Sequence, residues 1–326
     1  MKHKAGVTCW LLVGMLVGAD GIAEEYNYEI GLAFDSTRFD GSQTITTLGG
    51  TIFNSGETDT DDLSVLGSWY FAGLSDDKGP RARAALVDRA SSLSVGYSQS
   101  EQTISSFLTS DDPSFPFPPN DSRFDSDGDT FTIDLRYVDR DSGWFGNAGW
   151  LTSNTTLNGF VSQSFDATGW RLGVGKYVFE NTTLNLDVSQ VDVDGQGDAT
   201  VAAVSLEHLG DLGERWQYAI DFGFSRVDAD SDVELDTWGA SIALYPTRDF
   251  EFGVAVEDIS NNSDLIGVDT TGIEGFASWF VTPKVRLSAR YRVDDVGFVP
   301  NVNIGGAPTV NDADQYSFGI SATIRF

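Results

Sequence analysis

Beyond its first 23 residues this chain has no cysteine, a single histidine and no long apolar run. Cys9, the only cysteine among 326 residues, falls within that N-terminal stretch, so the remainder cannot form a disulfide or a thiolate metal site. No later stretch is apolar over the ~20 residues that a membrane-spanning helix needs. If the chain crosses a membrane, it must do so as a closed β-barrel, in which every backbone amide finds a partner.

Basic side chains are scarce as well. The chain has 20 lysines and arginines against 49 aspartates and glutamates, and its formal net charge is -29. Nucleic-acid binding draws its affinity mainly from basic side chains on phosphates, so nucleic acid is excluded as a partner. Acid-rich chains are often disordered, but 12% aromatic residues and a regular apolar alternation argue against disorder here.

The N-terminal stretch has the order of a secretory signal peptide. Lys2 and Lys4 precede an apolar run over residues 7–17, and small residues follow up to Ala23. This order predicts cleavage after Ala23, so that residues 1–23 are removed and residues 24–326 form an exported, single-domain protein. A retained membrane anchor is the alternative, but the apolar run is shorter than the ~20 residues of a spanning helix.

The C-terminal segment 315–326 alternates between apolar residues and small or polar ones. Its apolar positions include Tyr316, Phe318, Ile320 and Phe326. A period of two predicts a β-strand, and the length matches the ~9–11 residues with which a tilted strand crosses a bilayer. Aromatic residues near both ends suit the two membrane interfaces. We interpret the aromatic terminus Phe326 as the membrane-insertion residue of an outer-membrane barrel.

The same alternation recurs along the chain and predicts an all-β fold, a transmembrane antiparallel up-and-down β-barrel of about 14 strands. The expected strands cover residues 26–35, 62–72, 90–100, 129–139, 153–163, 167–179, 182–192, 199–209, 215–227, 234–245, 248–258, 269–281, 283–294 and 315–326. If residues 44–53 form a strand of their own rather than extending their neighbours, parity makes about 16 strands the alternative. The pattern by itself also fits a soluble β-sandwich, whose apolar face would be a core.

The predicted connections alternate between tight turns and acidic loops. Turns are expected at 180–181, 246–247 and 282–283, and loops at 192–198, 228–232, 258–268 and 294–314. Outer-membrane barrels have short periplasmic turns and longer external loops, so this asymmetry favours a membrane barrel. Residues 104–129, in which prolines and phenylalanines interleave, are the longest stretch expected to be irregular. This stretch either folds into the barrel and narrows it or caps the outer mouth.

Residues 70–98 carry a more specific pattern. They read Tyr-Phe-Ala-Gly-Leu at 70–74, Lys-Gly-Pro at 78–80, Arg-Ala-Ala-Leu-Val-Asp-Arg-Ala-Ser-Ser-Leu at 83–93 and Val-Gly-Tyr at 95–97. This resembles the porin family of Gram-negative outer-membrane β-barrels, in which a strand ending in aromatics leads to a proline and an Ala-rich segment. The resemblance implies a channel in the outer membrane, without catalytic residues. Homotrimers are common among porins, although no feature of this sequence marks a subunit interface.

Charged residues fall out of phase with the apolar positions of the predicted strands. An Arg or Lys on the lipid-facing side at the membrane midplane costs ~2–4 kcal/mol, so we expect these residues to line a water-filled lumen. The set is Glu29, Asp35, Asp134, Arg136, Arg171, Asp187, Glu207, Asp221, Glu251, Glu257, Glu274, Arg286, Arg290 and Arg292. Its last three members form a basic ladder on one strand that should face carboxylates on others. Opposed rows of charge set ion selectivity in pores.

No motif points to catalysis or to a cofactor. Hydrolysis by an activated serine usually needs a histidine base, and His208 is in phase with the lipid-facing residues, so we expect no enzyme activity. Asp192, Asp194 and Asp198 resemble the start of a calcium loop. Ala203 stands where a bidentate glutamate is expected, which leaves these aspartates as weak metal candidates.

The sequence thus predicts an outer-membrane porin for passive diffusion of small hydrophilic solutes, in which an acidic lumen favours cations. Outer-membrane lipid and lipopolysaccharide are the expected surroundings, with divalent ions bridging acidic loops to the lipopolysaccharide. The alternative is a closed barrel that acts as a receptor, an adhesin or a structural protein. Bulky lumen residues would then fill the interior, such as Tyr70, Phe160, Phe276 and Phe280.

Overall fold

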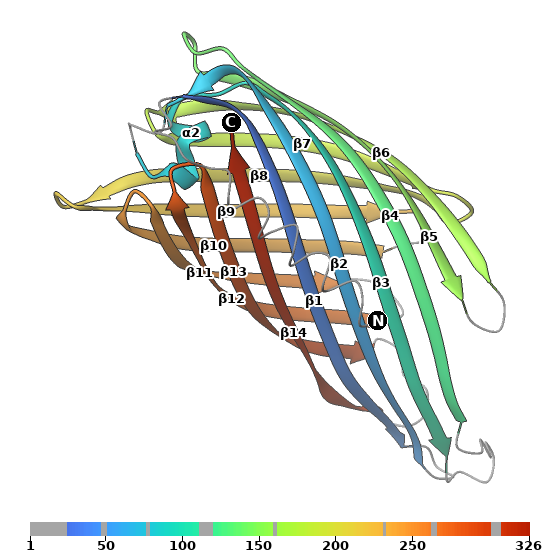
Figure 1. The fold of residues 1–326 in the computed structure, drawn as a ribbon. Coiled ribbons are helices and arrows are strands. Elements are labelled where there is room, and N and C mark those ends of the chain that lie inside the picture. The colour runs from blue at the N-terminus through green and yellow to red at the C-terminus, as the bar shows by residue number, and fades with distance from the viewer. Residues whose placement is uncertain are drawn as a thin grey trace.

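The computed structural model describes residues 25–46, 51–75, 79–110, 120–158, 162–230, 233–261, 266–300 and 308–326, which form a closed antiparallel β-barrel (Figure 1). Each strand pairs with its neighbours along the chain, and the first pairs with the last. The strands are β1 (Tyr26–Thr46), β2 (Thr51–Leu74), β3 (Ser92–Ser110), β4 (Asn120–Val138), β5 (Trp144–Asn158), β6 (Gln163–Phe179), β7 (Thr182–Val193), β8 (Gly197–Leu212), β9 (Trp216–Ala229), β10 (Val233–Thr247), β11 (Phe250–Asn261), β12 (Ile266–Thr282), β13 (Val285–Pro300) and β14 (Pro308–Arg325). Closure removes the sheet edges and excludes the two-sheet sandwich.

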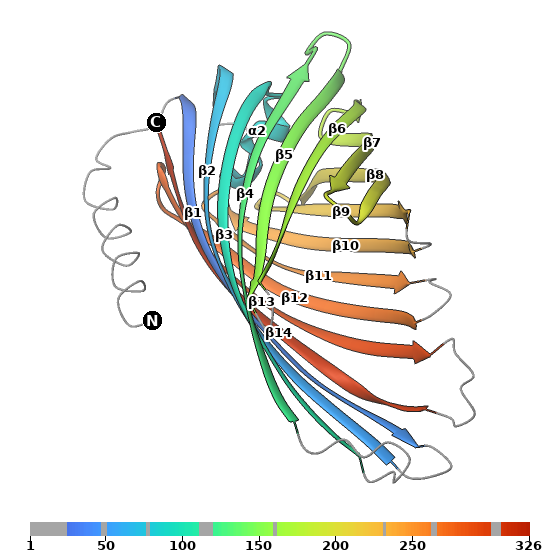
Figure 2. The same cartoon turned by 90° about the vertical axis from the view of Figure 1, so that its right-hand side faces the viewer.

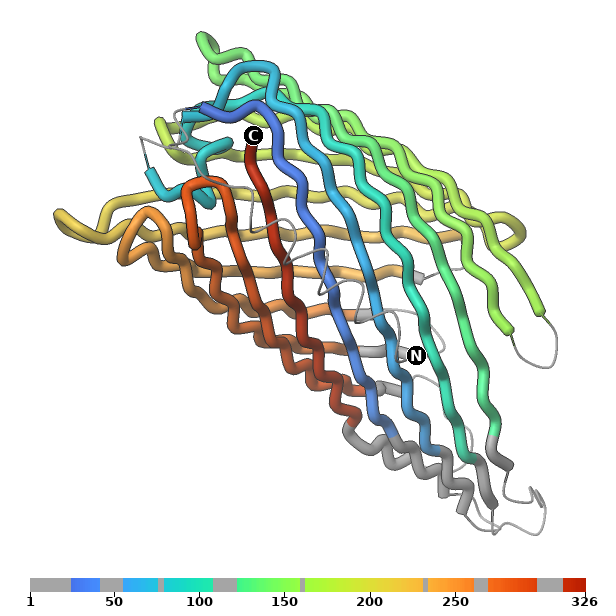
Figure 3. Tube along the Cα trace, in the orientation of Figure 1, coloured from blue at the N-terminus to red at the C-terminus, as the bar shows by residue number. Residues whose placement is uncertain are grey.

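The strands differ in length because β1–β4 continue far beyond the part that a membrane would enclose. β2 spans 24 residues and β7 spans 12, against the ~9–11 that a bilayer requires. Figure 3 shows β1–β4 reaching farther than the other strands at one end of the barrel. The prediction of 14 strands is confirmed. The alternative of 16 is wrong, because residues 44–46 and 51–53 extend β1 and β2 rather than forming a strand between them.

β5 is the strand whose predicted position is wrong. It begins at Trp144, well before the expected range 153–163. The lumen side of β5 carries Phe145 and Leu151, so both of its faces are partly apolar and the alternation that marks a half-buried strand is weak. Gly143, with φ of +72°, forms the tight turn that precedes the strand.

Residues 104–110 and 120–129 were expected to be irregular, but they are paired residues of β3 and β4. Residues 111–119 lie outside the described part of the chain. The prediction is wrong because a strand that projects into water needs no apolar face, so alternation does not mark it. Polar contacts hold this hairpin instead, such as the one from Thr103 Oγ1 to Asp125 Oδ1 at 3.0 Å. Its described residues prolong the barrel wall.

The outward face of the barrel carries an apolar band with an aromatic edge at each end. At one edge Trp69 stacks on Tyr28, with ring centroids 6.4 Å apart. At the other edge Trp238 Nε1 donates a hydrogen bond to Asp258 at 3.1 Å. Exposed isoleucine, leucine and valine side chains lie between these edges. Rings with an apolar body and a polar contact suit membrane interfaces, so this band is a lipid-facing surface.

One end of the barrel, which we call the turn end, carries the short turns between strands (Figure 2). β1 begins and β14 ends at this same end. The Phe326 amide donates to the Tyr28 carbonyl at 2.9 Å and the Asn27 amide to the Phe326 carbonyl at 2.8 Å, which pairs the C terminus with β1. The turn expected at residues 180–181 is confirmed by the end of β6 and the start of β7. The proposed signal peptide, residues 1–23, lies outside the described residues.

One connection at the turn end differs from the others. Residues 75–91 join β2 to β3 and contain two short helical elements, η1 (Arg81–Arg83) and α2 (Ala84–Val87). Figures 1 and 2 show α2 within the outline of the barrel near its turn end. Within the described ranges, none of the helices has the length and hydropathy to cross a membrane.

Candidate functional site at the base of the lumen

The β2–β3 connection occupies the turn end of the lumen. We call residues Gly79–Ala90 the plug. Its alanine-rich sequence favours compact helical turns with small side chains. Leu86, at 5% exposure, packs into a cluster of buried wall residues. These are Val138, Phe145, Tyr177, Leu209, Ala219, Ala243 and Tyr245. They come from β4, β5, β6, β8, β9 and β10, so the plug contacts much of the circumference.

Arg83 ties the middle of the plug to β8, β9 and β10. Its Nη1 donates to Glu207 Oε1 at 2.5 Å, its Nη2 to Asp221 Oδ2 at 2.7 Å and its Nε to the Tyr245 hydroxyl at 3.0 Å. Burial alone would lower the pKa of Arg83, but Tyr245, Asp221 and Glu207 outweigh burial and raise this pKa above its ordinary value. Arg83 therefore stays charged, and removing it leaves two carboxylates without their partner.

Two further arginines fix the start of the plug. Arg81 forms an ion pair with Asp249, and the Arg81 amide donates to the Arg248 carbonyl at 3.0 Å. Arg325 of β14 donates from Nη2 to the Arg81 carbonyl at 2.9 Å and from Nε to Glu29 Oε1 at 2.6 Å. Because Arg325 is only 3% exposed, this buried contact joins β1, β14 and the plug.

Arg89 fixes the end of the plug. Its φ of +49° is a left-handed conformation that residues other than glycine seldom adopt. The guanidinium lies 4.7 Å from the centre of the Tyr177 ring and donates to the carbonyls of Arg140 and Glu180, in the turns after β4 and β6. In return, Arg140 Nε donates to the Arg89 carbonyl at 3.3 Å. The plug is thus held at its start, middle and end.

The strand register places the charges expected to line the lumen on the inner side of the wall. Arg171 pairs with Asp187 at 2.9 Å. Glu251 accepts hydrogen bonds from the Tyr245 hydroxyl at 2.6 Å and from Ser278 Oγ at 2.8 Å. The inner face is therefore a network of paired charges and hydroxyl groups. Three acidic members of the set, Asp134, Glu251 and Glu274, form no ion pair within the described structure.

Two of the three arginines in the basic ladder of β13 pair with carboxylates. Arg292 contacts Glu257 at 2.5 Å and Asp294 at 2.7 Å. Arg290 reaches across β14 to Asp35 of β1, at 2.8 Å. Arg286 contacts no carboxylate within ion-pair distance among the described residues. Its Nη2 donates a 3.5 Å hydrogen bond to Thr323 Oγ1.

Glycines on the inner face make room for these charges. A Cβ atom added at Gly149 would collide with Asp134, and one at Gly173 with Asp187. The register places each of these glycines directly opposite the carboxylate on the neighbouring strand. Gly319 lies in the same way beneath the Asp35–Arg290 ion pair. A glycine opposite a charge on adjacent strands is thus a sequence signal for the lumen side.

Sequence reasoning missed the plug and its contacts through Arg83, Arg325 and Tyr245. The available signal was the helix-favouring run at residues 82–90, which is out of place between two strand patterns. This run lies within the segment 70–98 that resembles porins.

Of the bulky side chains considered as lumen fillers, two are buried at the base of the lumen. Tyr70 is 8% exposed and Phe280 is 4% exposed. The Tyr70 hydroxyl donates to Glu29 Oε2 at 2.8 Å, and the Arg325 guanidinium lies 4.4 Å from the centre of the Phe280 ring. Phe276 packs against the Leu86 cluster. Phe160 lies outside the described residues.

The histidine and the metal candidates lie apart from the plug. His208, on the lipid-facing side of β8, shares hydrogen bonds with Thr182 Oγ1 at 2.8 Å and the Tyr218 hydroxyl at 3.3 Å. Asp192 and Asp198 face each other across β7 and β8, and Asp198 accepts from Gln190 Nε2 at 2.9 Å. In the described part of the chain, no three His, Cys, Asp or Glu side chains are grouped to hold a metal ion, Asp192, Asp194 and Asp198 included.

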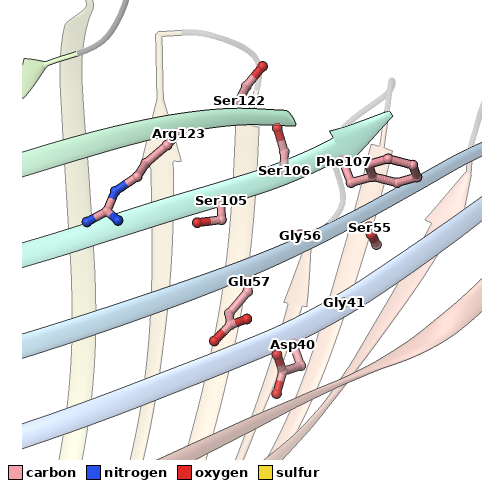
Figure 4. A pocket seen from close by; sticks show the side chains of 10 residues that line it. All are labelled: Asp40, Gly41, Ser55, Gly56, Glu57, Ser105, Ser106, Phe107, Ser122 and Arg123. Carbon is pink, nitrogen blue, oxygen red and sulfur yellow. The ribbon is translucent and has the colours of Figure 1, made fainter. Parts of the chain in front are cut away.

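A cavity of about 630 Å³ lies on the long outer part of β1–β4 (Figure 4). Asp40, Glu57 and Arg123 contribute its charged side chains, and serines and glycines make up most of the rest. Glu57, one of the lining residues, forms an ion pair with Arg38 at 2.7 Å. A second cavity lies against the plug, where Arg83 and Leu86 are among its lining residues. The two cavities share no residue, so the first belongs to the projecting wall and not to the base of the lumen.

Comparison with known proteins identifies the fold. No protein-family model and no curated protein matches the sequence. The structure is similar to the Acinetobacter baumannii outer membrane protein Omp33, with a TM-score of 0.51 and 18% identity over 94% of this chain and 100% of that one. It is also similar to a deletion mutant of the monoaromatic hydrocarbon channel TodX, with a TM-score of 0.54 and 15% identity over 92% and 91% of the two chains. These likenesses confirm the outer-membrane type of β-barrel at the level of the fold.

Proposed function

We propose that the protein is an outer-membrane channel for small hydrophilic solutes whose periplasmic end is held closed by the plug. The observation that carries this proposal is the contrast between the two faces of the wall. The outer face presents an apolar band, and the inner face presents charges, hydroxyl groups and glycines. A polar interior within a lipid-facing barrel is typical of aqueous channels. The turn end is assigned to the periplasm because outer-membrane barrels have their short turns there.

Space remains in the lumen beyond the plug. One cavity of about 560 Å³ reaches from Arg83 along β8–β13, and another of about 410 Å³ is bordered by Asp35, Glu274 and Arg290. Both are lined by polar groups of the inner wall. These cavities support a solute path that ends at the plug.

The second candidate function is a permanently closed barrel that serves as a receptor, an adhesin or a structural element. The filled base favours it, because Leu86 and its cluster leave the plug buried on the wall. A channel requires that the plug leave this position, whereas a closed barrel requires that it stay. The two candidates therefore differ in what happens when the contacts of the plug are weakened.

We also propose that the open channel favours cations. Carboxylates outnumber guanidiniums on the inner face, and Asp134 and Glu274 have no ion-pair partner among the described residues. Unpaired carboxylates in a confined lumen attract cations and repel anions. Arg290 and Arg292 of β13, which pair with carboxylates, offset part of this negative charge locally.

Planar-bilayer recording of a Leu86→Ala variant in a KCl gradient tests this function. The substitution removes apolar contacts worth ~2–5 kcal/mol without changing any charge, so it loosens the plug while keeping the lumen field. We expect channel steps with a reversal potential of cation-selective sign. A control variant, Leu212→Ala on the outer face, should behave as the wild type does. Absence of steps from a folded Leu86→Ala barrel would favour the closed barrel, and an anion-selective sign would contradict the cation preference.

A further inference from the structure

Two lumen arginines differ from the rest in having no carboxylate partner. Arg83, Arg171, Arg290, Arg292 and Arg325 each form an ion pair. In the part of the chain that the structure describes, Arg136 and Arg286 form none. They are held by weaker contacts with the wall.

Aromatic rings position these two guanidiniums. The Arg136 Cζ atom lies 4.4 Å from the centre of the Phe145 ring, and its Nη2 donates to the Tyr177 hydroxyl at 3.4 Å. The Arg286 Cζ atom lies 5.9 Å from the centre of the Phe280 ring. The Nε atoms of both arginines are buried without a hydrogen-bond acceptor. Buried donors are nearly always satisfied in proteins, so an Nε donor without an acceptor is unusual in each of these two guanidiniums.

Both arginines border one cavity of about 330 Å³ directly above the plug. Ala82, Arg83 and Leu86 contribute its plug side. Arg136 comes from β4 and Arg286 from β13, which are separated along the wall by β3, β2, β1 and β14. Two separate guanidiniums therefore face a single chamber of small-molecule size.

The carboxylates of this chamber are already engaged. Glu207 is bonded to Arg83 at 2.5 Å. Glu251 accepts hydrogen bonds from Tyr245 and Ser278 with its two oxygens. The charged groups of the chamber that have no carboxylate partner among the described residues are the guanidiniums of Arg136 and Arg286. An entering anion meets these two positive charges, whereas an entering cation finds no carboxylate free of a hydrogen-bond partner in the chamber.

We propose that this chamber binds a small dicarboxylate, with one carboxylate on Arg136 and the other on Arg286. The planar fork of a guanidinium matches a carboxylate in two parallel hydrogen bonds, which a hydroxyl or an amide cannot reproduce. Two such forks on different strands select a solute with an acidic group at each end. The dicarboxylate is proposed as a ligand of the closed barrel and not as a transported solute, because the open channel is proposed to favour cations. Its binding therefore does not rest on the proposed channel function.

Isothermal titration calorimetry of the refolded, detergent-solubilised wild-type barrel with succinate tests the site. We expect saturable binding that is absent with succinamide, the uncharged analogue of the same length. Arg136→Gln and Arg286→Gln should each weaken succinate binding by about tenfold or more, because each removes charged hydrogen bonds. Arg226→Gln, an arginine on the outer face that pairs with Glu234, should bind succinate as the wild type does.

Heat-modifiable gel migration establishes that each variant is folded, and Arg136→Lys and Arg286→Lys provide a second comparison. If they retain part of the affinity that the glutamine variants lose, the charge at each position is confirmed as the binding group. The proposal is overturned if succinate does not bind, if the two glutamine substitutions leave binding unchanged, or if inorganic phosphate binds as tightly as succinate. A failure of channel opening in the Leu86→Ala recordings would leave this equilibrium measurement unaffected, so the two proposals fail separately.

Discussion

On the inner wall, the size of a side chain on one strand depends on the charged side chains of the neighbouring strands. Gly319 of β14 lies between Asp35 of β1 and Arg290 of β13, and both of these side chains lean over it to meet at 2.8 Å. A bulkier residue in place of this glycine would occupy the volume through which the ion pair forms. Glycine is thus required here for its missing side chain and not for its backbone freedom.

Gly319→Val should destabilise the barrel by ~1–3 kcal/mol, the usual cost of forcing extra carbon atoms into a filled site. Urea unfolding of the protein refolded into lipid vesicles measures this difference. Gly275→Val is the matched control, because Gly275 lies on the lipid-facing side of β12 and an added Cβ there meets nothing within 4 Å. Equal unfolding midpoints for the two variants would contradict the role assigned to Gly319.

At the scale of the strands, the sequence pattern differs between the part that crosses the membrane and the part of β1–β4 that projects beyond it. Inside the apolar band, side chains alternate between lipid and lumen, and this alternation identified most of the strands. Outside the band both faces meet water, and residues such as Thr103 and Asp125 pair across β3 and β4 without an apolar pattern. The projecting hairpin is therefore an addition to the barrel and not a requirement for its closure.

Deleting residues 107–121 and joining Ser106 to Ser122 by an Asn-Gly turn should leave a folded barrel. Ser106 and Ser122 are already paired, and a strand needs only ~9–11 residues to cross a bilayer. Heat-modifiable gel migration of the refolded variant measures this outcome. Loss of the heat-modifiable form in the variant, under conditions in which the full-length chain refolds, would show that the projecting hairpin is needed for folding.

The sequence predicts the barrel well and its base poorly, for a physical reason. Alternation is local, so it reveals the strands and places charges such as Arg171 and Asp187 on the lumen side. It fails for β5, where Phe145 makes the inner face apolar as well. The plug depends on contacts between distant parts of the chain, such as that between Arg83 and Asp221, which are 138 residues apart. No local pattern reports which carboxylates an arginine in a short helical turn will meet.

As a whole, the molecule is a barrel with a polar lumen whose turn end is occupied by the plug, the connection between β2 and β3. Arg83 holds the middle of that segment through Glu207, Asp221 and Tyr245. Hydrogen bonds to charged groups contribute ~1.5–3 kcal/mol each, and a change of ~1.4 kcal/mol alters an open-to-closed ratio tenfold. The loss of Arg83 alone should therefore shift the barrel measurably towards an open state.

Liposome swelling in arabinose tests this central claim most directly, because it measures the flux of an uncharged hydrophilic solute through the lumen. We expect Arg83→Gln to swell liposomes several times faster than the wild type, and the control variant Arg226→Gln to match the wild type. Equal swelling rates for folded wild-type and Arg83→Gln barrels would contradict the claim that the plug closes a solute-conducting channel.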